Sequence, residues 1–204
     1  ASFATDGTLE VRATPPDSAN FKTVRVEIWN GANAVQLDTS QFPGGLWTWS
    51  PTRNRAQTAA AGLGTVSTSV TVRLYAVSHT NIDSSVVTVA ASSSAPSTPT
   101  GLTHTWSGDT GTAGADVIVT HTVVAGLAYY LSIDTLERQI IPGRYAYTYQ
   151  QNAAEHSSTA DPVLSLSLVA ENGLGQRSSA ATATATATVA SENGPHSVGS
   201  NVNS

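Results

Sequence analysis

The chain has 204 residues, a formal net charge of -5, 40% hydrophobic residues and only 11% charged residues. Ordinary soluble domains carry about 25% charged residues, so Ser and Thr hydroxyls are expected to make much of this surface polar. One lysine, Lys22, and scattered arginines form no basic stripe, which disfavours a nucleic-acid partner. No apolar run reaches the roughly 20 residues of a membrane-spanning helix, so we expect no membrane insertion. The absence of cysteine excludes disulfides and thiolate metal ligands.

Short stretches of alternating apolar and polar residues make up the first half of the chain. A period of two residues is typical of strands with one buried face. No long stretch shows the period of 3.6 that marks an amphipathic helix, so the sequence predicts an all-β fold. The alternation covers residues 9–13, 24–28, 70–76 and 87–89.

A segment rich in Pro and Ser, residues 92–99, separates these stretches from a second set. Prolines remove backbone donors and restrict the residue before them, so the segment is typical of a linker. The alternation resumes in residues 117–119, 130–133, 164–168 and 181–189. The predicted organisation is a first domain at 1–93, a second domain at 94–191 and a polar C-terminal tail at 192–204.

The two halves look like copies of one unit. Setting Ala76 against Ala170 gives a shift of about 94 residues, which is repetition at the scale of a domain. The same shift lays Ser84-Ser85 on Ser178-Ser179, and each pair opens a last strand after a turn. Each half has the length and the short strands of a β-sandwich.

Several segments resemble the fibronectin type III family. Residues 70–77 with Ser84-Ser85 resemble the last hairpin of such a domain, and residues 168–178 resemble it more closely. Residues 9–17 and 21–29 resemble its second strand, Pro-rich turn and third strand. The family's usual tyrosine before the penultimate strand is absent, so we describe the units as Ig-like. The resemblance implies two tandem Ig-like, fibronectin type III-like β-sandwich domains.

The first domain is short at its beginning. If residues 9–13 form the second strand of a sandwich, only residues 1–7 remain for the first strand, whereas residues 101–106 fill that role in the second domain. The chain also lacks an initial Met. We therefore expect an incomplete first strand, an edge available to another chain, and a polypeptide cut from something longer.

A search for catalytic and metal-binding patterns is negative. The sequence has no Gly-x-Ser-x-Gly, no His-Glu-x-x-His and no phosphate loop. His104 and His121 fall on neighbouring expected strands, but no carboxylates follow at ligand spacing. The loop from Asp109 to Asp116 offers oxygen ligands without the spacing of a calcium-binding EF-hand. We predict no enzymatic activity, no cofactor and no metal.

Aromatic residues gather in two expected extended segments. Trp47 and Trp49 share one face of the first segment, and Tyr145, Tyr147 and Tyr149 share one face of the second. Such rings stack on sugars or contact protein partners, which makes these five residues the candidate partner- or glycan-binding residues. Packing in a core or between domains is the favoured alternative, because only 6% of the residues are aromatic and a sandwich core needs most of them.

The remaining two tryptophans, Trp29 and Trp106, are assigned to the core.

The composition as a whole, with little lysine, much Thr, Ser and Ala, and tandem sandwiches, resembles the fibronectin-like segments of bacteriophage tail tip, hub or fibre proteins. The resemblance implies a structural virion component that acts as a spacer and adhesive module. Its partners would be other virion proteins, copies of itself or a host-surface glycan. The alternative is an accessory glycan-binding or spacer module of a secreted, extracellular bacterial enzyme or adhesin.

Overall fold

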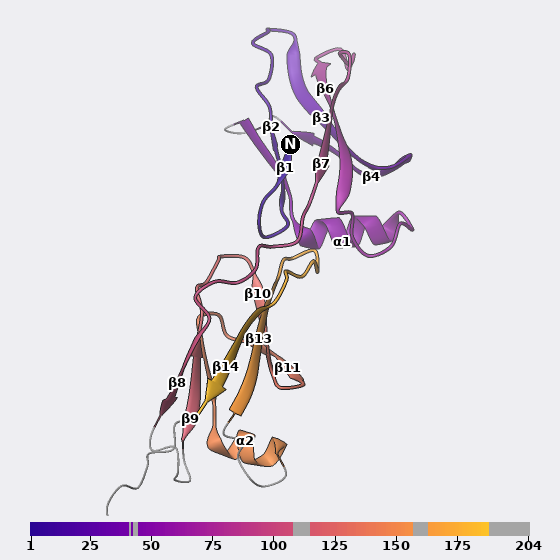
Figure 1. Ribbon diagram of the computed structural model, residues 1–204. Coiled ribbons are helices and arrows are strands. Elements are labelled where there is room, and N and C mark those ends of the chain that lie inside the picture. The colour runs from indigo at the N-terminus through magenta and orange to yellow at the C-terminus, as the bar shows by residue number, and fades with distance from the viewer. Residues whose placement is uncertain (41, 43–44, 108–114, 157–162, 188–204) are drawn as a thin grey trace, which may run out of the picture.

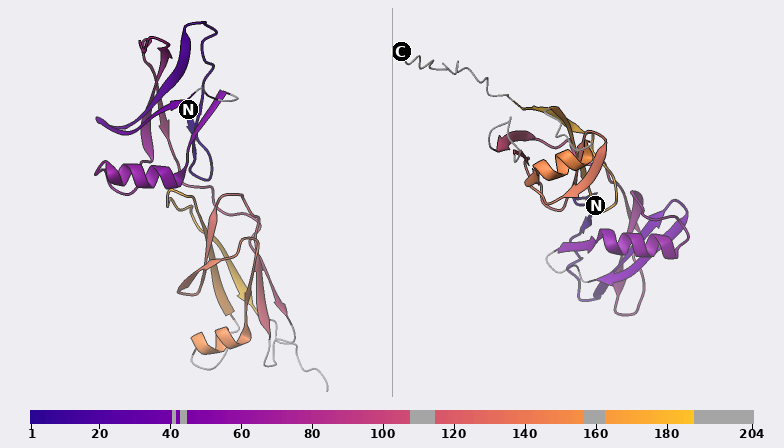
Figure 2. Two further views of the ribbon diagram at one scale, coloured as in Figure 1. Left: turned by 180° about the vertical axis from the view of Figure 1, so that it is seen from behind. Right: turned by 90° about the horizontal axis from the view of Figure 1, so that it is seen from below.

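The computed structural model describes residues 1–40, 42, 45–107, 115–156 and 163–187. Two β-sandwiches follow one another along the chain and lie end to end (Figures 1 and 2). Each sandwich consists of a three-stranded and a four-stranded sheet, and each carries one short helix. The predicted fold class, two tandem Ig-like β-sandwich domains, is confirmed.

The first domain pairs its strands in the order β1-β2-β5 and β4-β3-β6-β7, all antiparallel. Helix α1 connects β5 to β6 and lies at the end that faces the second domain (Figure 1). The elements are β1 Ser2–Phe3, β2 Leu9–Arg12, β3 Phe21–Asn30, β4 Asn33–Ser40, β5 Leu46–Trp49, α1 Pro51–Ala60, β6 Ser69–Ser78 and β7 Val87–Ser92.

The second domain repeats this order with β8-β9-β12 and β11-β10-β13-β14. Its helix α2 has the same place between the fifth and sixth strands, at the far end of the molecule (Figure 2). The elements are β8 Thr103–Ser107, β9 Asp116–Thr120, β10 Ala128–Ile133, β11 Leu136–Ile140, β12 Arg144–Tyr147, α2 Tyr149–Glu155, β13 Val163–Glu171 and β14 Ala181–Thr186.

Alternation along the strands builds two separate hydrophobic cores. In β13, for example, Leu164, Leu166 and Leu168 are fully buried while Ser165 between them is exposed. One core takes its buried side chains from residues 9–91 and the other from residues 117–185. The boundary at 93/94 stays a prediction, and the expected tail at 192–204 lies outside the described residues.

The internal repeat is visible in the last hairpin of each domain. Ser84 Oγ accepts a hydrogen bond from the Ala76 amide, and Ser178 Oγ accepts one from the Ala170 amide, both at 3.0 Å. Each serine hydroxyl then donates to the next carbonyl oxygen in the chain. The shift read from the sequence therefore aligns structurally equivalent residues.

Two short helices interrupt the strand pattern, and their starting signals are local. Ser50 caps α1 by accepting from the Arg53 amide, with Pro51 in the first turn, where its missing N–H is not needed. Thr148 caps α2 in a reciprocal capping box with Gln151. Both helices are too short to show a clear apolar face, which is why periodicity did not predict them.

Candidate functional site: the joint between the domains

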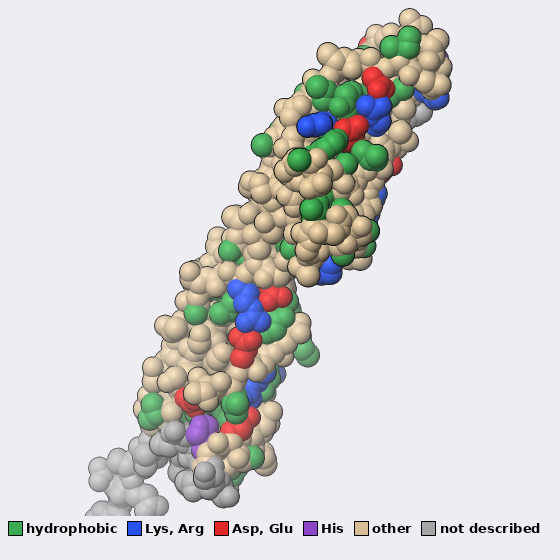
Figure 3. All heavy atoms as spheres, turned by 90° about the vertical axis from the view of Figure 1, so that its right-hand side faces the viewer, with side chains coloured by type: hydrophobic (Ala, Val, Ile, Leu, Met, Phe, Trp, Pro, Cys, Tyr) green, Lys and Arg blue, Asp and Glu red, His purple; other side chains and the backbone are tan. Residues whose placement is uncertain are grey.

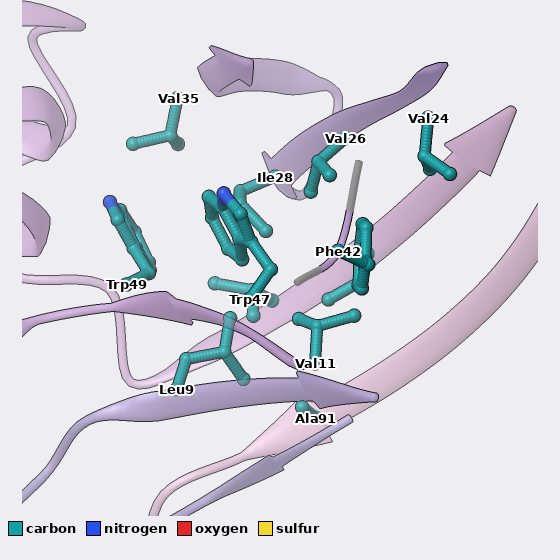
Figure 4. Close-up of a cluster of buried hydrophobic side chains, with 12 residues drawn as sticks. Leu9, Val11, Val24, Val26, Ile28, Val35, Phe42, Trp47, Trp49 and Ala91 are labelled. Atoms are coloured by element: carbon teal, nitrogen blue, oxygen red, sulfur yellow. The ribbon is translucent and has the colours of Figure 1, made fainter. Parts of the chain in front are cut away.

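Trp47 and Trp49 lie in the first core and not on the surface. Trp49 is 0% exposed and Trp47 is 7% exposed, and both indoles lie in the space between the two sheets, with Val26 and Ile28 on one side (Figure 4). The Trp47 ring nitrogen donates to Asp38 Oδ2 at 3.2 Å, so this polar atom already has a partner. Neither ring presents a free face to a sugar, as the core-packing alternative expected.

The three tyrosines do not share one face. Tyr147 is completely buried and donates its hydroxyl to Glu155 Oε2 at 2.7 Å. Tyr145 is half-buried, and its hydroxyl accepts from Arg138 Nη1 at 3.3 Å. Tyr149 is the first residue of α2 and leaves the line of the strand, because the chain turns into the helix at Thr148. The expected row of three rings is therefore wrong for Tyr149.

A charged cluster beside α2 fixes the buried Tyr147. Burial raises the pKa of the Tyr147 phenol, and its hydrogen bond to Glu155 raises it further. Burial also raises the pKa of Glu155, but the hydrogen bonds from Arg138 and Tyr147 outweigh that effect and hold it below its ordinary range. The Arg138–Glu155 ion pair measures 3.1 Å. The cluster therefore ties α2 to the sandwich.

Trp29 lies on the outer face of the four-stranded sheet, so its assignment to the core is wrong. Its ring nitrogen donates to Glu27 Oε2 at 2.9 Å, and the Arg73 guanidinium lies 4.1 Å above its ring. Arg25 stacks in the same way over Tyr75, at 4.2 Å. Trp106, by contrast, packs against the second core as expected.

The second domain carries a similar stack on its outer face. Arg177 lies 4.3 Å above the Tyr130 ring and pairs with Glu171 at 2.7 Å and with Glu137 at 3.0 Å. On the face in Figure 3, basic and acidic side chains lie beside one another over each domain. Arg25 and Arg177 are each ion-paired with two carboxylates, so their stacks stabilise the sheet surface.

The histidines give no metal site in the described residues. His121 is buried, and its Nε2 accepts from the Gly143 amide at 2.9 Å while its Nδ1 lies 3.0 Å from the Thr122 carbonyl. Both ring nitrogens are therefore engaged, with the proton on Nδ1. No group of three or more His, Asp or Glu side chains that could hold a metal occurs in the part of the chain that the structure describes. Residues 108–114 of the expected oxygen-rich loop lie outside that part.

The loop between β13 and β14, residues 172–176, forms the joint between the domains, and we call it the joint loop. Asn172 is 4% exposed and shapes the loop from within. Its Oδ1 accepts from the amides of Leu174 and Gln176, and its Nδ2 donates to Gln176 Oε1. The loop therefore meets the first domain as a preformed surface.

Backbone and side-chain hydrogen bonds join the loop to the first domain. The Gly173 amide donates to the Asp6 carbonyl at 2.9 Å, and Arg55 Nη2 of α1 donates to the Gly173 carbonyl at 3.0 Å. On the other side of the loop, Ser93 Oγ donates to Gln176 Oε1 at 2.7 Å. Three separate segments of the first domain are thus bonded to one loop of the second.

Close packing at Gly173 makes the joint tight. A Cβ atom there would lie 2.7 Å from Pro51 Cγ and 2.8 Å from the Asp6 carbonyl oxygen. Leu174 next to it is 5% exposed and contacts Gly7. Gly173 is required by this approach of two domains, because any side chain would push them apart.

The equivalent loop of the first domain, residues 78–82, has the same backbone hydrogen bond but does not form a joint. The Ser78 amide donates to the Ile82 carbonyl just as the Asn172 amide donates to the Gln176 carbonyl. His79 stands where the second domain has Gly173, and it is exposed. The sequence alone does not reveal the joint, because glycines in a turn fit ordinary turn geometry. The signal that it carries is an apolar residue, Leu174, in the middle of that turn.

No helix in the described residues is long and apolar enough to cross a membrane.

No protein-family model matches the chain, and no curated protein matches it. Among solved structures, the chain is similar to the FN1–FN3 domains of chicken CNTN1, with 12% identity over 90% of this chain and 63% of that chain and a TM-score of 0.33. It is also similar to the fibronectin(III)-like modules of CbhA from Clostridium thermocellum, with 15% identity, coverage of 96% and 93%, and a TM-score of 0.31. Both overlaps are low, so the fold assignment rests on the chain's own sheets and cores.

Proposed function

We propose that the chain is a non-catalytic spacer that holds two β-sandwich domains at a fixed orientation within a larger assembly. The joint loop carries this proposal. A flexible tandem pair would meet through a solvated linker, because relative motion is the default between domains with a small interface. Here the Gly173 backbone is bonded on both sides, to Asp6 and to Arg55, and it packs against Pro51 without room for a side chain.

The assembly that we propose is a bacteriophage tail, with the chain in its tip, hub or fibre and located in the virion. The support is compositional: a single lysine, no cysteine and many hydroxyl side chains on the strands. Other virion proteins or copies of the chain would be the partners. A host-surface glycan receives less support, because three of the five candidate aromatic residues are buried.

The alternative is a spacer in a secreted bacterial enzyme or adhesin. A rigid pair of sandwiches would serve equally well there, since spacing depends on the joint and not on the source. Identification by mass spectrometry of the proteins that accompany this chain in its native source separates the two settings. Virion proteins would support the tail, and a polysaccharide-degrading enzyme would overturn it.

Rigidity itself is tested by a distance measurement between spin labels. The chain contains no cysteine, so Thr88→Cys on β7 and Thr182→Cys on β14, both exposed, provide one label in each domain. We expect a single narrow distance distribution. Gly173→Val should broaden it, because the new side chain cannot fit against Pro51 and the Asp6 carbonyl.

His79→Val is the matched control, because His79 has the equivalent loop position in the first domain and is exposed. The distribution should stay narrow in that variant. A broad distribution in the labelled parent chain would overturn the spacer proposal, whatever the variants show.

A further inference from the structure

Arg73 differs from the two other arginines that stack on a ring of an outer sheet face. Arg25 and Arg177 each pair with two carboxylates at 3.1 Å or less. The Arg73 guanidinium forms no ion pair or hydrogen bond with any residue that the structure describes, and its contact is the ring of Trp29. A guanidinium is a planar fork of N–H donors that fits a carboxylate. These donors are therefore available to a group from outside the chain.

Glu27 does not pair with Arg73, although the two residues lie opposite each other on β3 and β6. Glu27 is 9% exposed, its Oε2 accepts from the Trp29 ring nitrogen at 2.9 Å, and its Oε1 lies 3.1 Å from Arg25 Nε. Both carboxylate oxygens are thus engaged. The hydrogen bond to Glu27 holds the Trp29 ring in place, and the Arg73 guanidinium lies 4.1 Å from the centre of that ring. Trp29 therefore orients Arg73, and the N–H groups point outward at the edge of the stack.

An exposed leucine lies on the same sheet face as Arg73. Strand pairing across β4, β3, β6 and β7 places four residues in one row: Leu37, Glu27, Arg73 and Thr88. Paired residues of neighbouring strands point to the same face of a sheet. Leu37 is 62% exposed, and it lies two strand spacings, about 10 Å, from Arg73. We call Trp29, Leu37 and Arg73 together the outer patch.

The second domain lacks this patch, although it has the same strand order. The shift of 94 residues places Ser167 at the position of Arg73. The row that corresponds to the one above consists of Glu137, Ser132, Ser167 and Thr182. A sandwich of this kind therefore needs neither an unpaired arginine nor an exposed leucine on its outer face. The outer patch is a property of the first domain and not of the fold, which points to a role in binding.

We propose that the outer patch binds a segment of another protein that presents a carboxylate to Arg73 and an apolar side chain to Leu37. The proposal goes beyond the spacer function, and it relies on that function only for the assembly in which the partner occurs. Arg and Trp are enriched among the residues that contribute most to binding between proteins. Arg also binds a carboxylate through two parallel N–H bonds. A sugar fits the patch less well, because Arg73 already covers a face of the Trp29 ring.

The test uses the full chain and a capped tetrapeptide, Leu-Gly-Gly-Glu, whose leucine and glutamate lie about 10 Å apart when it is extended. NMR signals of the Trp29 indole N–H, the Arg73 side-chain N–H and the Leu37 methyl groups are followed as the peptide is added to millimolar concentration. We expect saturable shifts at all three residues. The matched peptide Leu-Gly-Gly-Gln should give shifts at least about fivefold smaller, because its amide carries no charge.

Substitutions of Arg73 test its part in binding. Arg73→Gln should abolish the response to the glutamate peptide, and Arg73→Lys should weaken it, because an ammonium group lacks the planar fork. Arg177→Gln is the matched control, since Arg177 also stacks on an aromatic ring but is already paired with two carboxylates. The response should be unchanged in that variant. Amide signals of the first core verify that each variant is folded, and the comparison of the two peptides needs no variant.

Shifts that require both the glutamate carboxylate and Arg73, and do not require Arg177, support the proposal. Absence of a shift at any of the three residues in the parent chain, an equal response to Leu-Gly-Gly-Gln, or a response that persists in Arg73→Gln overturns it. Galacturonate, an acidic sugar, is added separately, and larger shifts than with the peptide would assign the patch to a glycan and overturn the proposal. Concentration-dependent shifts without peptide would make a second copy the occupant and would also overturn it. None of these outcomes depends on the spin-label distance, so the spacer proposal stands or fails separately.

Discussion

Single buried polar residues decide where the helices attach. Asn54 on α1 is 0% exposed and is hydrogen-bonded to the backbone of Ser67. Its Oδ1 accepts from the Ser67 amide at 2.8 Å, and its Nδ2 donates to the Ser67 carbonyl at 2.7 Å. Thr58 donates to the same Oδ1. Asn152 on α2 is buried in the same manner, at 2% exposed. A buried polar residue therefore attaches each short helix to its sandwich, as an apolar face does for a longer helix.

Replacing Asn54 should be costly. Asn54→Ala leaves the buried Ser67 amide and carbonyl without partners, and each unsatisfied buried group costs about 1–3 kcal/mol. We expect the free energy of unfolding of the first domain to fall by at least ~2 kcal/mol, measured by urea denaturation. Asn33→Ala at the exposed start of β4 is the control and should change little. Equal effects of the two substitutions would contradict the role given to Asn54.

The ionisation of Glu155 makes the folding stability of the second domain depend on pH. Its pKa is held below its ordinary range in the folded protein by Arg138 and Tyr147, against the opposing effect of burial. The unfolded chain therefore takes up the proton first, so the stabilisation is complete above about pH 5 and is lost as the pH falls through the folded-state pKa. Glu155→Gln should flatten the fall of stability below about pH 5 relative to the parent chain. Melting temperatures between pH 3 and pH 7 test this, with the exposed Asp17→Asn as control.

Strands and helices differ in how far the sequence specifies them. Strand β13 follows from its alternation of Leu and Ser, because each one-residue step moves a side chain to the opposite face. Helix α2 follows from its cap, Thr148 with Gln151, and from its attachment through Tyr147 and Glu155. Both helices carry local capping signals in the sequence, Ser50 with Pro51 and Thr148 with Gln151, which a search for periodicity does not detect.

The cap of α2 should be measurable on its own. Thr148→Ala removes the hydroxyl that accepts from the Gln151 amide, and loss of such a cap costs about 1 kcal/mol. Thr52→Ala on the exposed part of α1 is the control, since Thr52 lies inside the helix and not at its cap. Urea denaturation should show the loss only for Thr148→Ala. A larger effect of the control would contradict the capping role.

At the scale of the whole molecule, the joint couples two domains that are otherwise complete. The two cores share no residue, so the coupling passes through the contacts between the domains, which are those of the joint loop and the close approach of Gly126 to Asp6. Leu174 fills the space beside Gly7, and the Gly173 amide is held by Asp6 of the first domain. Exchange of the Gly173 amide with solvent therefore reports on opening of the joint.

Leu174→Ala should loosen the joint without unfolding either sandwich. Truncating a buried leucine typically costs about 2–5 kcal/mol, and part of that cost falls on the closed joint. We expect the Gly173 amide to exchange at least about tenfold faster, equivalent to ~1.4 kcal/mol, while the amide of Leu168 in β13 is unchanged. Leu74→Ala, at a partly buried leucine packed against the first core, is the control and should leave Gly173 unaffected. Exchange at Gly173 that does not respond to Leu174→Ala would contradict the coupling.

The sequence by itself determined the all-β class, the two units and their repeat, because a buried sheet face imposes alternation on every strand that lines it. It also limited the candidate residues to a few aromatics. Only the tertiary structure decided that Trp49 and Tyr147 are core residues and that Trp29 is not, since alternation distinguishes two faces without saying which one is covered. The joint was likewise decided by contact between distant segments: the space beside Gly173 exists only because Pro51 and Asp6 reach it from the other domain.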